Sequence, residues 1–266
     1  MNFTTPVIID KLPFTLMPGE GLLFVGSCFA ENISRLAADD QFQVTANPYG
    51  TMYNPVSIAH TVERVEKIPR VVFLTLGTNH VYVDRGTGLI VDNCEKRPAR
   101  EFQERCLSVT ECAEALERVV EDICRRQPEA WVVITVSPIR YAKYGFHGSM
   151  LSKATLLLAA DEVCSRYERA IYFPAYEIVN DELRDYRFYA PDMIHTSAQT
   201  AEYIYGRLAD VCFSDQLREF LREWHSVRAA LAHRPLHPES EEYKKFAADT
   251  ECRLQALKEK YPFVKC

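Results

Sequence analysis

Residues 22–30 read Leu-Leu-Phe-Val-Gly-Ser-Cys-Phe-Ala and join a short apolar run to a helical pattern. The run from residue 22 to residue 25 has no polar side chain, which is typical of a strand buried on both faces of a sheet. Apolar residues then recur at helical spacing, at Phe29, Ile33 and Leu36. Ser27 therefore lies where a strand ends and a helix begins, and the unpaired backbone N–H groups of such a helix end favour a nearby negative charge.

Similar apolar runs recur along the first 212 residues. They are residues 22–25, 71–74, 131–134 and 171–173, with a weaker alternating stretch at 42–45. Helical patterns fall between them, including Cys112 to Ile123 after a capping-box sequence at 108–111, then 151–167 and 201–212. This alternation predicts an α/β fold, a doubly wound three-layer α/β/α sandwich around a central parallel sheet. In such folds ligands bind beyond the carboxyl ends of the strands.

After Cys212 the pattern changes to helices alone. One is expected over 217–227 and another over 240–261, with a break at the Pro-containing segment 233–238. We therefore predict an α/β domain over 1–212 and a helical C-terminal extension over 213–266. This extension would pack on the domain or on a second subunit, which makes a homo-oligomer through these helices an expectation.

Composition excludes several classes of protein. The chain has 266 residues, 47% of them apolar, which is enough for a large core, and a net charge of −6. This charge favours neither nucleic acid nor an anionic membrane as a partner. The chain lacks a secretory signal pattern and a run long enough to span a bilayer, so a cytoplasmic protein is expected.

Cysteine and histidine spacing argues against a metal centre. The nine cysteines are odd in number and scattered, without a CxxC pair, and are expected to be reduced and mostly structural. His233 and His237 are four residues apart, but Pro235 makes a continuous helix through them improbable. No metal ligand set is therefore expected.

Ser27, Asp192 and His195 carry the groups of a hydrolytic triad. A serine hydroxyl is a weak nucleophile that needs an imidazole to take its proton and a carboxylate to orient that imidazole. The sequence Asp192-Met-Ile-His195 can present a carboxylate and an imidazole from one short loop. The alternative for Ser27 is a structural N-cap of the following helix.

Other polar residues are expected at the same edge of the sheet. Asn79 can donate its side-chain amide to an oxyanion and Gly50 its backbone N–H, although both residues also suit ordinary turns. Cys28 is a possible second nucleophile, because a thiol at a helix N-terminus can have a lowered pKa, but we expect it to be buried against the sheet. Further candidates for the pocket are His80, Ser137, Arg140 and Tyr189.

The order of these motifs resembles that of the SGNH, or GDSL-like, hydrolases, and residues 26–30, Gly-Ser-Cys-Phe-Ala, resemble the signature that names the GSCFA family. Segments 135–138, 151–154, 181–189 and 192–195 are also similar to that family, and the resemblance covers about residues 20 to 250. The chain differs from the GDSL pattern at two places. Gly26 directly precedes Ser27 with no Asp between them, and His80 follows Asn79 where many relatives have Asp.

The resemblance implies a flavodoxin-like three-layer fold and ester hydrolysis. It assigns Ser27 as the nucleophile, Asp192 and His195 as the rest of the triad, and Gly50 and Asn79 as the oxyanion hole with the Ser27 N–H. We therefore expect a serine esterase that acts on a small acyl ester, such as an acetylated carbohydrate, through an acyl-enzyme and without a cofactor. The alternative is a catalytically silent protein that binds a sugar or an acyl ligand in the same pocket.

Overall fold

The computed structural model describes residues 4–265, and its centre is a five-stranded parallel sheet in the order β2-β1-β3-β7-β8. The strands are β1 (Gly21–Gly26), β2 (Gln43–Ala46), β3 (Val71–Leu76), β7 (Trp131–Val136) and β8 (Ala170–Tyr172). All four neighbouring pairs are parallel. The five strands expected from the apolar runs are confirmed, with the weak stretch at 42–45 forming the edge strand β2.

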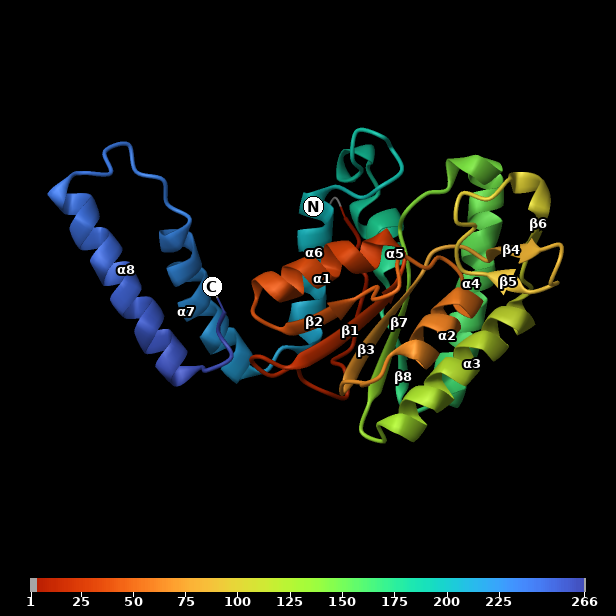
Figure 1. Cartoon of the computed structure of the whole chain (residues 1–266), viewed down its shortest axis with the longest axis horizontal. Coiled ribbons are helices and arrows are strands. Elements are labelled where there is room, and N and C mark those ends of the chain that lie inside the picture. Colours follow the sequence, from red (N-terminus) through yellow and green to blue (C-terminus); the bar gives the residue numbers. More distant parts are fainter. Residues whose placement is uncertain (1–3, 266) are drawn as a thin grey trace.

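Helices cover both faces of this sheet (Figure 1). Helices α1 (Cys28–Asp39) and α6 (Ala198–Cys212) lie on one face, and α2 (Pro55–Arg64), α3 (Val109–Arg126) and α4 (Gly145–Arg166) lie on the other. Alternate residues of β1 serve the two layers, since Phe24 packs in the cluster with α1 and α6 while Leu23 packs in the cluster with α2 and α3. The three-layer flavodoxin-like α/β/α fold is therefore confirmed.

A second, antiparallel sheet was not expected from the sequence. It has the order β5-β4-β6 and consists of β4 (His80–Asp84), β5 (Ile90–Val91) and β6 (Phe102–Cys106). Four of the five residues of β6 are exposed, so these strands lack the continuous apolar run that indicates a buried strand. Figure 1 shows this small sheet beside α4, at the edge of the molecule.

Helix boundaries differ from the expected ones at two places. Helix α2 was not predicted, although Asn54 accepts the Ser57 N–H as its N-cap and Pro55 occupies its first position. Helix α4 begins at Gly145, six residues before the expected start, since its first turn lacks a regular apolar pattern. Short helical turns complete the chain at α5 (Ala175–Glu177) and at residues 99–101, 142–144, 178–183 and 186–188.

The C-terminal extension consists of α7 (Asp215–Leu231) and α8 (Glu241–Lys260), and it packs beside α1. The indole of Trp224 donates to the carbonyl oxygen of Asp39 at 2.7 Å, and Phe220 is fully buried in the cluster that contains α1. The expected break between the two helices is confirmed. The division near residue 212 and the assembly of subunits stay predictions.

Two further expectations concern the state of the cysteines and a segment that could span a membrane. All eight cysteines within residues 4–265 are free thiols, while Cys266 lies outside the described residues. In the same range, no helix combines the length and the apolar character needed to cross a bilayer.

Candidate active site

The loops that follow β1, β3 and β7 meet at the carboxyl edge of the parallel sheet. The strand order reverses at β1, because the next strand along the chain, β2, lies on one side of β1 while β3 and the later strands lie on the other. Such a reversal leaves a crevice at the carboxyl ends of the two strands. Ser27 and Cys28 follow β1, residues 77–79 follow β3 and residues 137–140 follow β7.

Gly26 makes the sharp turn from β1 into α1 possible. Its φ is +142°, and a Cβ at this position would lie 2.2 Å from the carbonyl oxygen of Thr75 on the neighbouring strand. The Gly26 N–H donates to the side chain of Asn47 at 2.9 Å. A residue with a side chain would force β1 and β3 apart at the point where the site begins.

Ser27 is the N-cap of α1 and is completely buried. Its Oγ lies 3.2 Å from Thr75 Oγ1 and accepts the N–H of Phe29 at 3.3 Å. Its backbone N–H donates to Thr75 O at 3.0 Å. Within the described residues the hydroxyl therefore bonds to Thr75 on β3 and to the first turn of α1, and its hydrogen bonds do not involve His195.

Cys28 occupies the first helical position of α1 and is partly exposed, in contrast to the buried position that we expected. Burial is still the main influence on its thiol and raises the pKa; Glu31 raises it further, while Lys153 lowers it. The charges of Glu31 on α1 and Lys153 on α4 therefore act on the thiol in opposite directions. Its neighbour Ser27 faces Thr75.

Asp192 and His195 form a preorganised pair in the loop before α6. The Asp192 carboxylate lies 2.6 Å from His195 Nδ1 and accepts the backbone N–H groups of Ile194 and His195 at 2.9 and 3.0 Å. These bonds lower the pKa of Asp192 to about 2, and the bond to the His195 side chain has the largest effect. The carboxylate is therefore charged at neutral pH. It holds the imidazole through Nδ1, so Nε2 takes no part in the contact with Asp192.

Arg140 ties this loop to the end of β7. Its backbone N–H donates to Ile194 O at 3.1 Å and its Nη1 to Met193 O at 2.9 Å. The imidazole of His195 is therefore held at the same edge of the sheet as the β1–α1 turn, although 168 positions separate Ser27 from His195 in the sequence.

The two expected oxyanion donors are occupied by bonds within the protein. Asn79 Nδ2 donates to Leu107 O at 2.7 Å, and the buried Asn79 Oδ1 has no partner. The Gly50 N–H donates to Asn47 O at 2.9 Å, in a turn where Gly50 has a φ of +97°. The Gly50 N–H would have to release its acceptor before it could bind an oxyanion, whereas the Asn79 amide nitrogen keeps a second N–H besides the one that Leu107 O accepts.

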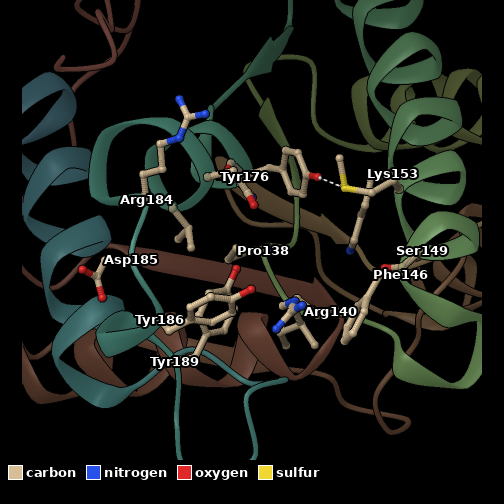
Figure 2. A pocket seen from close by; sticks show the side chains of 14 residues that line it. Pro138, Arg140, Phe146, Ser149, Lys153, Tyr176, Arg184, Asp185, Tyr186 and Tyr189 are labelled. Atoms are coloured by element: carbon tan, nitrogen blue, oxygen red, sulfur yellow. Dashed lines mark hydrogen bonds between the residues drawn. The ribbon is translucent and has the colours of Figure 1, made fainter. Parts of the chain in front are cut away.

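A cavity of about 320 Å³ opens beside the end of β7. Figure 2 shows Arg140 on its floor between Phe146 on one side and Tyr186 and Tyr189 on the other. The guanidinium carbon lies 4.1 Å from the Phe146 ring centre and 5.5 Å from that of Tyr189. An arginine among aromatic rings is suited to polar groups on a flat or ring-shaped ligand.

The remaining pocket candidates lie in different places. Ser137 is fully buried next to this cavity, and its carbonyl oxygen accepts a hydrogen bond from Lys153. His80 lines a separate groove beside the small sheet, where it stacks on Tyr144 with ring centres 3.5 Å apart. Burial lowers the pKa of His80, although the nearby Glu104 opposes this effect. The sequence placed Ser137 and His80 at the same edge of the sheet and did not show that they lie in different places.

Lys153 is a site residue that our reasoning from the sequence missed. It lies on α4, lines the cavity and is 2% exposed, and its Nζ donates to Gly77 O at 2.6 Å and to Ser137 O at 2.7 Å. Burial lowers its pKa to about 7. A signal was present, because Lys153 falls within the buried stripe of α4, which runs through Ser149, Ser152, Leu156, Ala160 and Val163.

Comparison with known proteins places the chain in a family. The GSCFA family profile matches residues 21–69 and 66–208, and a second profile, the C-terminal domain of GSCFA domain proteins, matches residues 224–266. The chain therefore belongs to the GSCFA family. A search of curated proteins finds no match.

Solved structures with a similar fold include hydrolases. A protein described as a GDSL-like lipase from Parabacteroides merdae is 10% identical, with a TM-score of 0.51 over 74% of this chain and 99% of that one. A carbohydrate esterase family 3 protein from Talaromyces cellulolyticus is 11% identical, with a TM-score of 0.45 over 77% and 99%. The first of these likenesses supports the three-layer fold of GDSL-like proteins and, at this identity, the fold alone.

Proposed function

We propose that this protein hydrolyses esters of small acyl groups at the carboxyl edge of its parallel sheet. The observation that carries the proposal is the Asp192–His195 pair. Arg140 holds the loop of this pair at the carboxyl edge of the parallel sheet, the edge that also carries the β1–α1 turn. An imidazole oriented by a charged carboxylate is the base that hydrolytic acyl transfer requires. The β1–α1 turn offers a hydroxyl at Ser27 and a thiol at Cys28 as nucleophiles.

In the triad of Ser27, His195 and Asp192, the serine hydroxyl would first have to rotate. Its present bonds to Thr75 Oγ1 and Phe29 N keep it in the capping position. After rotation, His195 would take the hydroxyl proton while the oxygen attacks the ester carbonyl carbon. Water would then release the acyl group from the enzyme, and no cofactor takes part in either step.

The oxyanion of this reaction would form close to the N-terminus of α1. Backbone N–H groups of the first helical turn favour negative charge there. Gly50 and Asn79 are the further donors that we propose: the Gly50 N–H would exchange Asn47 O for the oxyanion, and Asn79 would donate the second N–H of its amide nitrogen while the first stays bonded to Leu107 O.

The cavity beside β7 is proposed to hold the alcohol part of the substrate. Its volume of about 320 Å³ is large enough for a small sugar, and its lining combines Arg140 with Phe146, Tyr186 and Tyr189. Aromatic faces pack against the apolar face of a sugar ring, and the guanidinium can donate to its hydroxyl groups. We therefore propose acetylated carbohydrates as the class of substrate to test first.

Hydrolysis of p-nitrophenyl acetate and of a panel of acetylated monosaccharides by the wild type and by His195→Ala tests the proposal. We expect turnover by the wild type and at least a hundredfold lower kcat/KM for the variant, since the proton acceptor is lost. Asp181→Asn, a change on an exposed residue outside the cavity, is the matched control.

The competing function is binding without turnover. If a folded wild-type protein bound an acetylated sugar in calorimetry but hydrolysed none of these esters, the esterase proposal would be rejected and the binding protein retained. Equal turnover by the wild type and His195→Ala would show that the Asp192–His195 pair does not carry the reaction.

A further inference from the structure

The guanidinium of Arg140 lies on the floor of the cavity beside β7 without a carboxylate to balance its charge. It donates to Met193 O at 2.9 Å through Nη1. Among residues 4–265, no acidic side chain forms an ion pair with it, in contrast to Arg207, which pairs with the buried Glu182. A guanidinium carries several N–H groups and no acceptor, so the remaining ones are available to a ligand in the cavity.

Aromatic side chains fix the position of this guanidinium. Its central carbon lies 4.1 Å from the ring centre of Phe146, 5.6 Å from that of Tyr186 and 5.5 Å from that of Tyr189. Figure 2 shows the arginine between Phe146 and the two tyrosines. A donor that is already held in place loses little conformational freedom when a ligand binds, and this favours tight recognition.

The charged side chains around the cavity favour an anion. The lining contains three cationic side chains and a single carboxylate, namely Arg140, Lys153, Arg184 and Asp185. The Asp185 carboxylate already accepts the backbone N–H of Arg187 at 2.8 Å and its guanidinium at 2.9 Å. Positive charge is therefore in excess here, although the chain as a whole has a net charge of −6. A local excess of this kind attracts negatively charged ligands to a cavity.

Lys153 contributes to this excess from the interior. Its side chain is 2% exposed, and in Figure 2 it runs from α4 toward the level of Arg140. Its Nζ donates to Gly77 O and Ser137 O, and a protonated amine has a further N–H beyond these two. Burial lowers the pKa of Lys153 to about 7, and an anion in the cavity would favour the charged form of the amine.

Arg140 also borders the loop that carries the proposed base. Its backbone N–H donates to Ile194 O at 3.1 Å, and His195 is the next residue of that loop. A substrate group bound by the guanidinium would therefore lie beside the loop that acts on the ester. Binding energy from such a group can position the ester for attack, because it restricts the substrate next to the reacting groups.

We propose that the alcohol part of the substrate carries an anionic oxygen group, a carboxylate or a phosphate, and that Arg140 binds it. This inference rests on the proposed ester hydrolysis and narrows its substrate to acetylated acidic sugars. The planar fork of a guanidinium donates two parallel N–H groups to two oxygens of either anion. The aromatic rings beside it would pack against the apolar face of the sugar ring.

Two matched pairs of substrates test whether charge is recognised. The first pair is the tri-O-acetylated methyl glycosides of glucuronic acid and of glucuronamide, which differ only in a carboxylate and its neutral amide isostere. The second is an acetylated glucose phosphate and the same sugar without phosphate. We expect the wild type to show at least a tenfold higher kcat/KM for the charged member of at least one pair. The pair that shows this preference identifies the anion, and equal rates within both pairs overturn the proposal.

Arg140→Met tests the residue that is assigned to the anion. Because Arg140 also holds the loop of His195, this variant should lower turnover of every ester, including the uncharged p-nitrophenyl acetate. Loss of the guanidinium should in addition reduce the preference for the charged substrate to within about twofold. The ratio of the two kcat/KM values therefore separates recognition from the position of the loop. A wild-type ratio in Arg140→Met overturns the assignment.

Two further variants serve as comparisons. Arg140→Lys keeps the positive charge but loses the planar fork, so its preference should lie between those of the wild type and Arg140→Met. Arg118→Met removes an exposed cation of α3 that is outside the cavity lining, and it should keep the wild-type ratio. A ratio lowered equally in Arg118→Met and Arg140→Met would attribute the preference to the charge of the whole protein and overturn the site.

Calorimetry with sugars that lack the ester tests the anion site apart from turnover. In the His195→Ala protein, we expect the sugar with the preferred anion to bind with at least a tenfold lower Kd than its neutral counterpart. Adding Arg140→Met should remove this difference, with the fold intact by circular dichroism. Sodium chloride should weaken binding of the charged sugar alone, because salt screens the attraction between the two charges. Equal Kd values for the charged and neutral sugars contradict the site.

The outcomes separate this inference from the proposed function. Turnover without a preference for either charged substrate overturns the anion site but leaves the esterase. Binding of the charged sugar that depends on Arg140, in a protein that hydrolyses none of the esters, rejects the esterase and retains the anion site. The absence of both turnover and selective binding overturns both.

Discussion

The Nζ atom of Lys153 lies 2.6 Å from the carbonyl oxygen of Gly77, at the end of the central strand β3. A second carbonyl, that of Ser137 after β7, accepts from the same nitrogen at 2.7 Å. Because the side chain is 2% exposed, water contributes little to its solvation, and these two dipoles are its main polar contacts. The lysine therefore links the carboxyl ends of β3 and β7 from within the interior of the protein.

Replacing this lysine should change how stability depends on pH. Burial lowers the pKa of Lys153 to about 7 from an ordinary 10.5, so the unfolded chain binds one more proton than the folded one between these values. The stability of the wild type relative to Lys153→Met should therefore rise with pH above 7, by up to about 1.4 kcal/mol per pH unit. Urea unfolding of both proteins at pH 7, 8 and 9 measures this slope. A flat or falling difference would mean that the buried amine stays charged.

The carboxylate of Asp192 should be needed for orientation more than for folding. In Asp192→Asn, the amide oxygen can still accept the N–H groups of Ile194 and His195, but the amide nitrogen cannot accept from His195 Nδ1. We expect kcat for p-nitrophenyl acetate to fall between a hundredfold and about ten-thousandfold with little change in Tm. Asp181→Asn is the control for a lost surface charge, and activity near the wild-type level in Asp192→Asn would contradict the role assigned to this pair.

Arg140 should control the mobility of the loop that carries His195. Arg140→Met keeps an apolar contact with Phe146 but loses the bond from Nη1 to Met193 O. We expect faster amide hydrogen exchange over residues 190–196 and about a tenfold lower kcat, because the imidazole spends less time in position. Unchanged exchange in this segment would show that the backbone bond from Arg140 to Ile194 is sufficient by itself.

Gly26 should tolerate no side chain. Gly26→Ala places a Cβ 2.2 Å from Thr75 O at a φ of +142°, and we expect a loss of about 3 kcal/mol or more in the free energy of unfolding. Gly206→Ala is the matched control. Its position in α6 is open, so the same substitution should stabilise by about 0.5–1 kcal/mol. Thermal unfolding of both variants decides the prediction, which fails if Gly26→Ala melts with the wild type.

Local patterns along the chain were enough to predict the layers of the fold. The apolar run at 22–25 and the periodic stripe at 112–123 each indicate a buried surface from their own spacing, because burial acts on neighbouring residues of one strand or helix. The exposed strand β6 has no such surface, which explains why the small sheet was missed. Helix α2 was missed although its cap was visible at Asn54.

The sequence by itself determined the three-layer sandwich, the order of its elements and the types of reactive side chain after each strand, since these follow from periodicity and from residue chemistry. Only the tertiary structure decided which of these side chains meet. The orientation of Ser27 depends on the backbone angles of Gly26 and on Thr75, a contact partner 48 positions from Ser27. Such contacts between distant segments are set by the packing of the sheet and helices, and no local pattern encodes them.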